Sequence, residues 1–133
     1  MDKLNTVKNT VDQLLGQGNF NIVDSVFSVN YVAHSGDKSY NGHKFIKQFA
    51  KQVRTALPNI KILNIELLSQ TDNVLTWQRT FSGTHKADLM GIPASNKKVK
   101  WYEIVVSRFD KDKIVEEWLV SDLAFQLILK QDK

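Results

Sequence analysis

The sequence contains no cysteine, only two prolines and only six glycines in 133 residues. The absence of cysteine excludes disulfide bonds, a thiol nucleophile and any zinc or iron–sulfur site that uses cysteine ligands. The few prolines and glycines, together with 42% hydrophobic and 24% charged residues, exclude a collagen-like or disordered chain. We expect a single domain over residues 1–133, with a core large enough to enclose a small pocket.

Long hydrophobic runs are absent as well. Charged and amide residues interrupt the apolar positions of the first twenty residues, which argues against a signal peptide. No stretch approaches the roughly 18 apolar residues of a membrane span, so we expect a cytoplasmic protein that does not associate with membranes. The net charge of +4 is dispersed along the chain, and the aromatic residues fall inside expected strands, which argues against nucleic-acid binding.

Hydrophobic periodicity divides the chain into a helical first part and a β-rich second part. Apolar residues at three- and four-residue steps predict helices near residues 2–16 and 22–27, and a third helix that ends before Pro58. A period of two then predicts long strands at about 60–69, 73–86, 98–109 and 113–123. We therefore expect an α+β fold in which three N-terminal helices pack on one side of a strongly curved antiparallel sheet.

The last expected strand carries two carboxylates on the same face as a large aromatic side chain. Alternation places on that face Ile114, Glu116, Trp118, Val120 and Asp122. A carboxyl group near apolar side chains can exchange protons near neutral pH, so Asp122 is a candidate general acid or base. Asp122 also stands directly before a possible helix at Leu123, and the sequence leaves a helix-capping role equally open.

The strand before the long loop also combines aromatic and ionisable residues on one face. That face carries Leu75, Trp77, Arg79, Phe81 and His85. We expect Arg79 to pair with a carboxylate on a neighbouring strand, Glu103 or Glu116, either to stabilise the sheet or to orient a ligand oxygen. His85 and His34 each have two possible roles, donation to a substrate carbonyl or a bond to loop backbone.

Motifs that bind metals or phosphates are missing. The three histidines show no HxH, HxxxH or HExxH spacing, and the chain has no GxGxxG, P-loop or GxSxG motif. We therefore expect no metal site and no cofactor, and either cofactor-free chemistry or none.

Several short segments, in this order, resemble the SnoaL-like polyketide cyclase (ester cyclase) family across nearly the whole chain. They are Tyr31-Val32-Ala33-His34, Leu57-Pro58-Asn59-Ile60, Gly83-Thr84-His85, Met90-Gly91-Ile92-Pro93, and Lys113-Ile114-Val115-Glu116-Glu117-Trp118 followed by Asp122. The resemblance implies the NTF2-like fold, a cone formed by a curved sheet and three helices around a pocket. In the polyketide cyclases of this family an intramolecular aldol condensation closes a ring, with an Asp as general acid or base and without metal or cofactor.

Residue by residue, the resemblance implies that Asp122 is that acid. His34, Arg79, His85, Glu116 and Trp118 match other recurrent motif positions in or beside the pocket. The loop that follows departs from the family pattern, with Lys86-Ala87 after the histidine and Pro93-Ala94-Ser95-Asn96-Lys97 at the turn. Because these residues shape the expected pocket mouth, the identity of the substrate is not carried over.

We expect a protein that binds a hydrophobic, carbonyl-containing small molecule, with Asp122 and His85 as the catalytic groups. The expected binding residues are His34, Arg79, Trp77, Trp101, Glu116 and Trp118. The alternative is a non-catalytic ligand-binding or dimerisation module, in which Glu116 pairs with Arg79 and Asp122 caps a helix. In both cases we expect a homodimer through the outer sheet face, which carries Tyr102, Ile104 and Val106.

Overall fold

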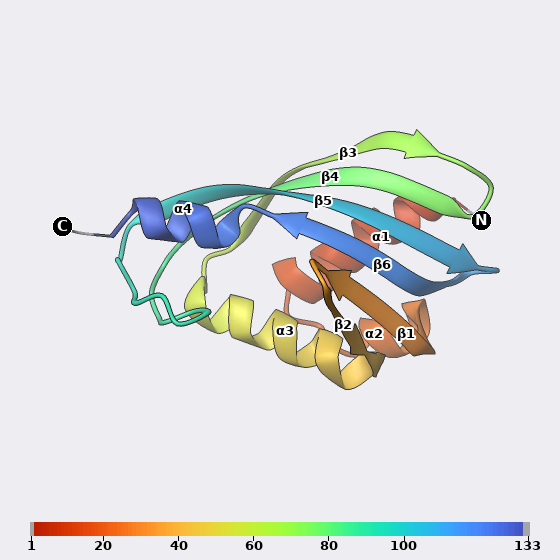
Figure 1. Cartoon of the computed structure of the whole chain (residues 1–133), viewed down its shortest axis with the longest axis horizontal. Coiled ribbons are helices and arrows are strands. Elements are labelled where there is room, and N and C mark those ends of the chain that lie inside the picture. Colours follow the sequence, from red (N-terminus) through yellow and green to blue (C-terminus); the bar gives the residue numbers. More distant parts are fainter. Residues whose placement is uncertain (1, 132–133) are drawn as a thin grey trace.

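A computed structural model describes residues 2–131 of the chain (Figure 1). The first part contains α1 (Lys3–Val11), the π-helical segment η1 (Asp12–Gly16), α2 (Ile22–Val26), β1 (Phe27–Ser35), β2 (Lys38–Asn41) and α3 (Gly42–Ala56). The second part contains β3 (Lys61–Gln70), β4 (Val74–Thr84), β5 (Lys98–Asp110), β6 (Lys113–Ser121) and α4 (Leu123–Leu129). The expected helices and four long strands are confirmed, and β6 ends before a helix at Leu123 rather than continuing to residue 123.

The strands form one six-stranded sheet in the order β2-β1-β6-β5-β4-β3. Its curvature and its helices confirm the expected α+β fold. Two features differ from the expectation of a purely antiparallel sheet. The brief extended stretch expected after the second helix forms the hairpin β1–β2. In addition, β1 pairs with β6 in parallel. The sequence pattern does not predict this pairing, because β1 and β6 are far apart along the chain.

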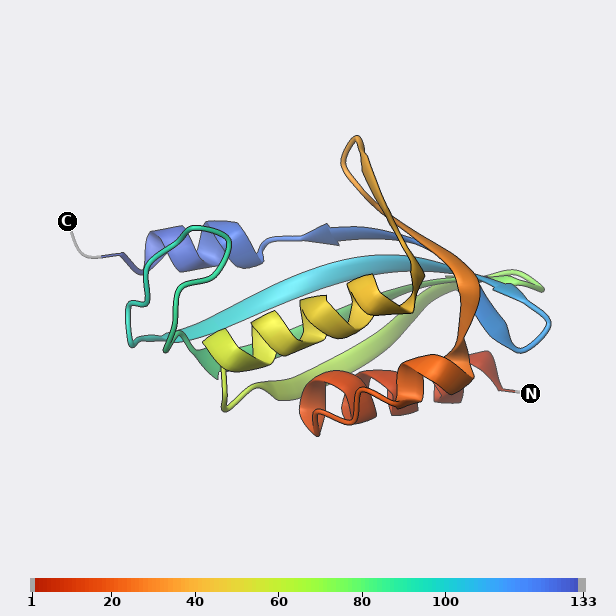
Figure 2. The same cartoon turned by 90° about the horizontal axis from the view of Figure 1, so that it is seen from below.

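Helices α1, α2 and α3 lie on the concave side of the sheet. Figure 2, a view from below, shows α3 lying across the long strands, α1 and α2 to one side of it, and the far end of the β1–β2 hairpin extending beyond the long strands. Asp2 caps the N-terminus of α1, and its carboxylate accepts a hydrogen bond from the Asn5 backbone N–H at 3.1 Å. Helix α3 buries an apolar stripe, namely Ile46, Ala50, Val53 and Ala56. No described helix is long and apolar enough to cross a membrane.

Arg54 joins α3 to the end of η1. Its Nη1 donates to the carbonyl oxygens of Leu15 at 2.7 Å and Gly16 at 3.0 Å. These carbonyls lie at the end of a helical segment, where intrahelical donors run out, so the guanidinium satisfies them. Gly18 follows with φ of +72°, in the left-handed region that glycine adopts most easily.

A β-bulge in β6 determines which of its side chains face the helices. Arg108 pairs with Glu116, but the next residue, Phe109, pairs with Ile114, so the intervening Val115 is extra. A one-residue insertion reverses the alternation of faces along a strand. The expected single face from Ile114 to Asp122 is therefore wrong, because Ile114 is buried at 2% exposure while Trp118 and Val120 are exposed.

Candidate functional site

The sheet and the helices enclose a cavity of about 350 Å³. Most of its wall is apolar, and includes Val7, Val11, Leu14, Phe27, Phe45, Phe49, Val105 and Leu119. Polar side chains in the wall are Thr10, Tyr31, His34, Ser35, Tyr40, Arg79 and Glu117. An apolar cavity of this size with few polar groups has the character of a small-molecule site.

Glu117 of β6 is the centre of a hydrogen-bond network in the cavity wall. The Tyr31 hydroxyl donates to Glu117 Oε1 at 2.8 Å. The Ser107 hydroxyl donates to Glu117 Oε2, and Trp77 Nε1 donates to Ser107 Oγ at 2.9 Å. The network therefore links β1, β4, β5 and β6. Each oxygen of the Glu117 carboxylate accepts a hydrogen bond from a hydroxyl on another strand.

Burial changes the acid–base properties of this network. Burial raises the pKa of Glu117, whereas the hydrogen bonds from Ser107 and Tyr31 and the charge of Arg79 oppose that rise. Burial and the nearby Glu117 carboxylate also raise the pKa of the Tyr31 hydroxyl above its usual range. Tyr31 therefore stays protonated, and Glu117 holds a proton more readily than an ordinary glutamate.

Arg79 forms a buried ion pair with Glu103 on the adjacent strand. Arg79 Nε lies 2.6 Å from Glu103 Oε1, and the two side chains are only 12% and 4% exposed. The Ser121 hydroxyl donates to the other Glu103 oxygen at 2.8 Å, and the Arg79 guanidinium lies 5.4 Å from the centre of the Trp77 ring. The expected pairing across neighbouring strands is confirmed for Glu103, and pairing of Arg79 with Glu116 is not observed.

Glu116 instead belongs to a second cluster at the rim of the cavity. His34 Nε2 lies 2.7 Å from Glu116 Oε2, and Arg108 Nε donates to Glu116 Oε1 at 3.0 Å. The bonds from His34 and then Arg108 lower the pKa of Glu116. The His34 ring stacks on Trp118 with 5.1 Å between ring centres. Only His34 of this cluster lines the large cavity.

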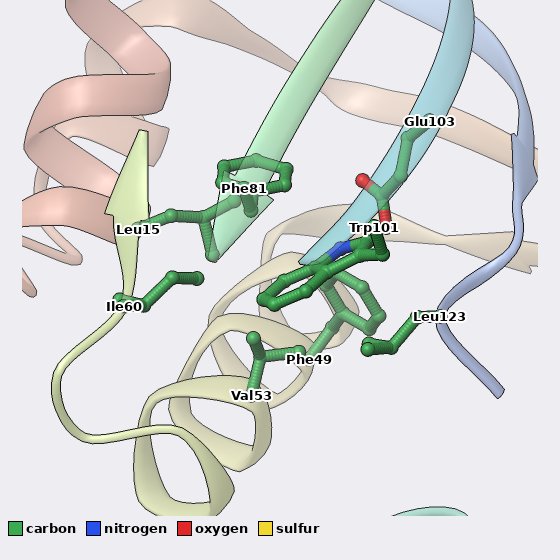
Figure 3. A pocket seen from close by; sticks show the side chains of 8 residues that line it. All are labelled: Leu15, Phe49, Val53, Ile60, Phe81, Trp101, Glu103 and Leu123. Carbon is green, nitrogen blue, oxygen red and sulfur yellow. The ribbon is translucent and has the colours of Figure 1, made fainter. Parts of the chain in front are cut away.

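Trp101 lies in a separate, much smaller cavity of about 10 Å³ (Figure 3). Its wall consists of Leu15, Phe49, Val53, Ile60, Phe81, Trp101, Glu103 and Leu123. Figure 3 shows Trp101 and Glu103 on the same strand, with the indole between the carboxylate and the apolar side chains. A space this small holds at most about one water molecule, so Trp101 serves as core here and not as a wall of the large cavity.

The two residues expected to be catalytic lie outside the wall of the large cavity. Asp122 accepts hydrogen bonds from the Tyr102 backbone N–H at 2.8 Å and from Gln126 Nε2 at 3.2 Å, and its side chain makes no capping bond to α4. His85 is fully buried at the end of β4, and within residues 2–131 neither of its ring nitrogens has a hydrogen-bond partner. Their catalytic roles stay predictions.

The structure thus brings together three of the expected site residues, His34, Trp77 and Arg79, in the cavity wall. Sequence reasoning missed the two residues at the centre of the network, Tyr31 and Glu117. Tyr31 belongs to the first family-like segment, and Glu117 is the second of two adjacent glutamates. The alternation rule favoured the first glutamate, and only the bulge in β6 selects the second.

Metal ligation has no candidate cluster in the part of the chain that the structure describes. No group of three or more His, Asp or Glu side chains there is arranged to hold a metal ion.

Comparison with known families and structures agrees with this architecture. The model of the SnoaL-like polyketide cyclase family matches residues 5–128. The chain belongs to this family. No curated protein matches the sequence at a significant level.

Solved structures share the fold at low sequence identity. A candidate SnoaL-like polyketide cyclase from Jannaschia superposes with a TM-score of 0.82 at 14% identity, over 92% of this chain and 87% of that chain. A SnoaL-like polyketide cyclase from Agrobacterium tumefaciens gives 0.76 at 22% identity, over 97% and 99%. AclR from Streptomyces galilaeus, described as a candidate hydroxylase, gives 0.79 at 18% identity, over 97% and 95%. This SnoaL-like chain therefore has an NTF2-like fold that occurs in proteins given different activities.

Proposed function

We propose that the cavity binds a hydrophobic small molecule with a carbonyl group, and that Glu117 transfers a proton at the carbon next to that carbonyl. The observation that carries the proposal is the Glu117 carboxylate, held by Tyr31 and Ser107 in the wall of a cavity of about 350 Å³, where desolvation raises its pKa. General acid–base catalysis is most effective when the pKa of the group lies near the working pH. Burial moves Glu117 in that direction from the acidic range of an ordinary glutamate.

The remaining groups of the wall have supporting roles in this proposal. The apolar and aromatic side chains bind the hydrocarbon part of the ligand through burial of apolar surface. Trp77 and Ser107 hold the Glu117 carboxylate in one orientation. The ion pair with Glu103 holds Arg79 in place, so its positive charge stays at a fixed position in the cavity wall. The reaction class is proton transfer of the aldol-cyclase or isomerase type, with no cofactor in the proposed step.

The experiment measures deuterium exchange at the carbons next to the carbonyl of β-tetralone, a bicyclic ketone, in heavy water. We expect the protein to accelerate this exchange, and we expect Glu117→Gln to reduce the acceleration by about 100- to 10,000-fold, the usual contribution of a general base. Glu66→Gln is the matched control, because Glu66 is exposed on β3 and does not line the cavity. An unchanged exchange rate in Glu117→Gln overturns the proposal.

Asp122→Asn in the same assay tests the catalytic role implied by the family resemblance. Loss of exchange in Asp122→Asn, with full activity in Glu117→Gln, means that Asp122 is the catalytic group and Glu117 is structural. Saturable binding of β-tetralone without any acceleration of exchange means that the chain is a non-catalytic binding module.

We further propose that a second copy of this chain covers the outer face of the sheet. Large apolar side chains are exposed there on adjacent strands, with Tyr102 at 42%, Ile104 at 40%, Trp118 at 40% and Val120 at 73%. Ile104 and Val120 are register partners, so they form one continuous apolar patch. Sedimentation at micromolar concentration is expected to give a dimer in the wild type and a monomer in Val120→Lys, and a monomeric wild type contradicts the proposal. The expected cytoplasmic location stays a prediction.

A further inference from the structure

The hydrogens of the Glu117 network can be assigned one by one. Trp77 Nε1 can only donate, so Ser107 Oγ accepts from it and directs its own hydrogen to Glu117 Oε2. Tyr31 directs its hydrogen to Glu117 Oε1. Both carboxylate oxygens are therefore acceptors, which is the arrangement that an ionised Glu117 requires.

A proton placed on the Glu117 lone pair that already accepts a hydrogen bond turns that donor away. A proton on Oε2 would point at Ser107 Oγ, and the Ser107 hydrogen would then need another acceptor. Ser107 is completely buried and does not line the cavity, so that hydrogen would be left unsatisfied at a cost typical of a buried orphan donor. A proton on Oε1 instead displaces the hydrogen of Tyr31, which does line the cavity. Protonation on the Tyr31 side is therefore favoured.

We propose that Tyr31 is the hydrogen-bond donor to the carbonyl oxygen of the ligand whenever Glu117 is protonated. This inference rests on the proposed function, because it assigns the partner of Glu117 in the same site. When Glu117 Oε1 takes the proton from the carbon next to the carbonyl, the C–H electron pair becomes the C=C bond of an enolate. The negative charge then appears on the ligand oxygen, at the moment when the Tyr31 hydrogen becomes free to stabilise it. The reverse step returns the proton from Oε1 to carbon.

Other ionisable groups facing the cavity do not alter the hydrogen bonds assigned to Glu117. Arg79 from β4 is held by Glu103 from β5, and His34 from β1 is held by Glu116. Tyr40 of β2 also lines the wall, and its ring stacks on Phe45 of α3. The wall residues of α1, η1 and α3 are uncharged. A pH effect that comes from His34 would persist in Glu117→Gln, so that variant separates the two sources.

The test follows the carbonyl stretching band and the dissociation constant of bound β-tetralone as the pH is varied. In the wild type we expect the band to move to lower wavenumber as the pH falls and Glu117 is protonated. In Tyr31→Phe the band stays unshifted, and the affinity is about two- to tenfold weaker than in the wild type at low pH only, as expected for one neutral hydrogen bond. Tetralin, which has no carbonyl, should bind both proteins equally. Tyr102→Phe is the control tyrosine, because Tyr102 does not line the cavity.

Glu117→Gln gives a second, opposite signature. The amide oxygen accepts from Ser107 and the amide N–H donates to Tyr31, as the protonated acid does. The band is therefore expected at lower wavenumber at every pH, although proton exchange is lost.

Three results overturn the inference. A pH-dependent shift that survives in Tyr31→Phe means that the Glu117 acid itself donates to the ligand. A wild-type band that does not respond to pH overturns the role of Tyr31, while the exchange assay still decides the proposed function independently. Absence of saturable β-tetralone binding overturns both.

Discussion

Replacing Arg79 with methionine should destabilise the protein strongly, because it leaves the buried Glu103 carboxylate without its cationic partner. Arg79 and Glu103 are 12% and 4% exposed and lie 2.6 Å apart. Removing one partner of such a pair costs about 3–5 kcal/mol, most of it the penalty for an uncompensated buried charge. The whole domain is expected to be stable by only about 5–15 kcal/mol, so the loss is a large fraction of the total.

The same sheet provides a matched control in Arg108→Met. Arg108 pairs with Glu116 at 3.0 Å, but its side chain is 42% exposed. An exposed pair contributes about 0–1 kcal/mol, since water and salt screen it. The comparison therefore holds the residue types and the change constant while the burial of the pair differs, and Glu116 also keeps His34 as a second partner.

Urea denaturation and thermal melts at neutral pH, both followed by circular dichroism, measure the two costs. For a chain of this size we expect Arg79→Met to lower Tm by about 10–20 °C, and Arg108→Met by no more than about 4 °C. Combining Arg79→Met with Glu103→Leu should recover part of the lost stability, because the orphaned charge is removed as well. A difference between Arg79→Met and Arg108→Met below about 1 kcal/mol would refute the reasoning.

Two further predictions concern Glu117 and Gly18. Because burial raises the pKa of Glu117, its contribution to stability is present below its unfolded pKa and is lost as the pH rises through its raised folded pKa. Glu117→Gln should therefore gain stability relative to the wild type as urea titrations move from about pH 4 to pH 9, while Glu66→Gln runs parallel to the wild type; a constant difference for Glu117→Gln contradicts this. Gly18→Ala should cost about 1–3 kcal/mol, because its φ is +72° and a Cβ would lie 2.7 Å from Arg54 Nε. Gly36→Ala, with φ of +63° and open space around it, should cost less in the same thermal melts, and equal costs would show that the contact with Arg54 is unimportant.

Much of the fold could be predicted from the sequence because helices and strands have different hydrophobic periods. The stripe of α3 and the alternation along β4 and β5 are local patterns, and each follows from burial of one face. The β1–β2 hairpin was not predicted because most of its residues are partly or fully exposed, so they show no clear alternation. Their place in the sheet depends on pairing with β6, which no local pattern records.

The site could be predicted only in part, for a related reason. Arg79 and Trp77 lie in a regular strand, where the alternation rule places them correctly in the cavity wall. In β6 one extra residue at Val115 exchanges the faces of Glu116 and Glu117. The sequence pattern therefore indicated the glutamate that pairs with His34 at the rim, and not the one that the cavity encloses.

The sequence by itself determined the class of fold, the family and the absence of any cysteine chemistry. It also indicated that Arg79 pairs with a carboxylate on a neighbouring strand. These follow from composition, periodicity and motif order, which are properties of neighbouring residues. Tertiary structure decided which carboxylate is desolvated and what holds it. Tyr31 and Glu117 meet 86 residues apart in sequence, and their hydrogen bond exists only because β1 is aligned in parallel with a bulged β6. A pKa depends on the surroundings of a group, and those surroundings are assembled only when distant strands pair.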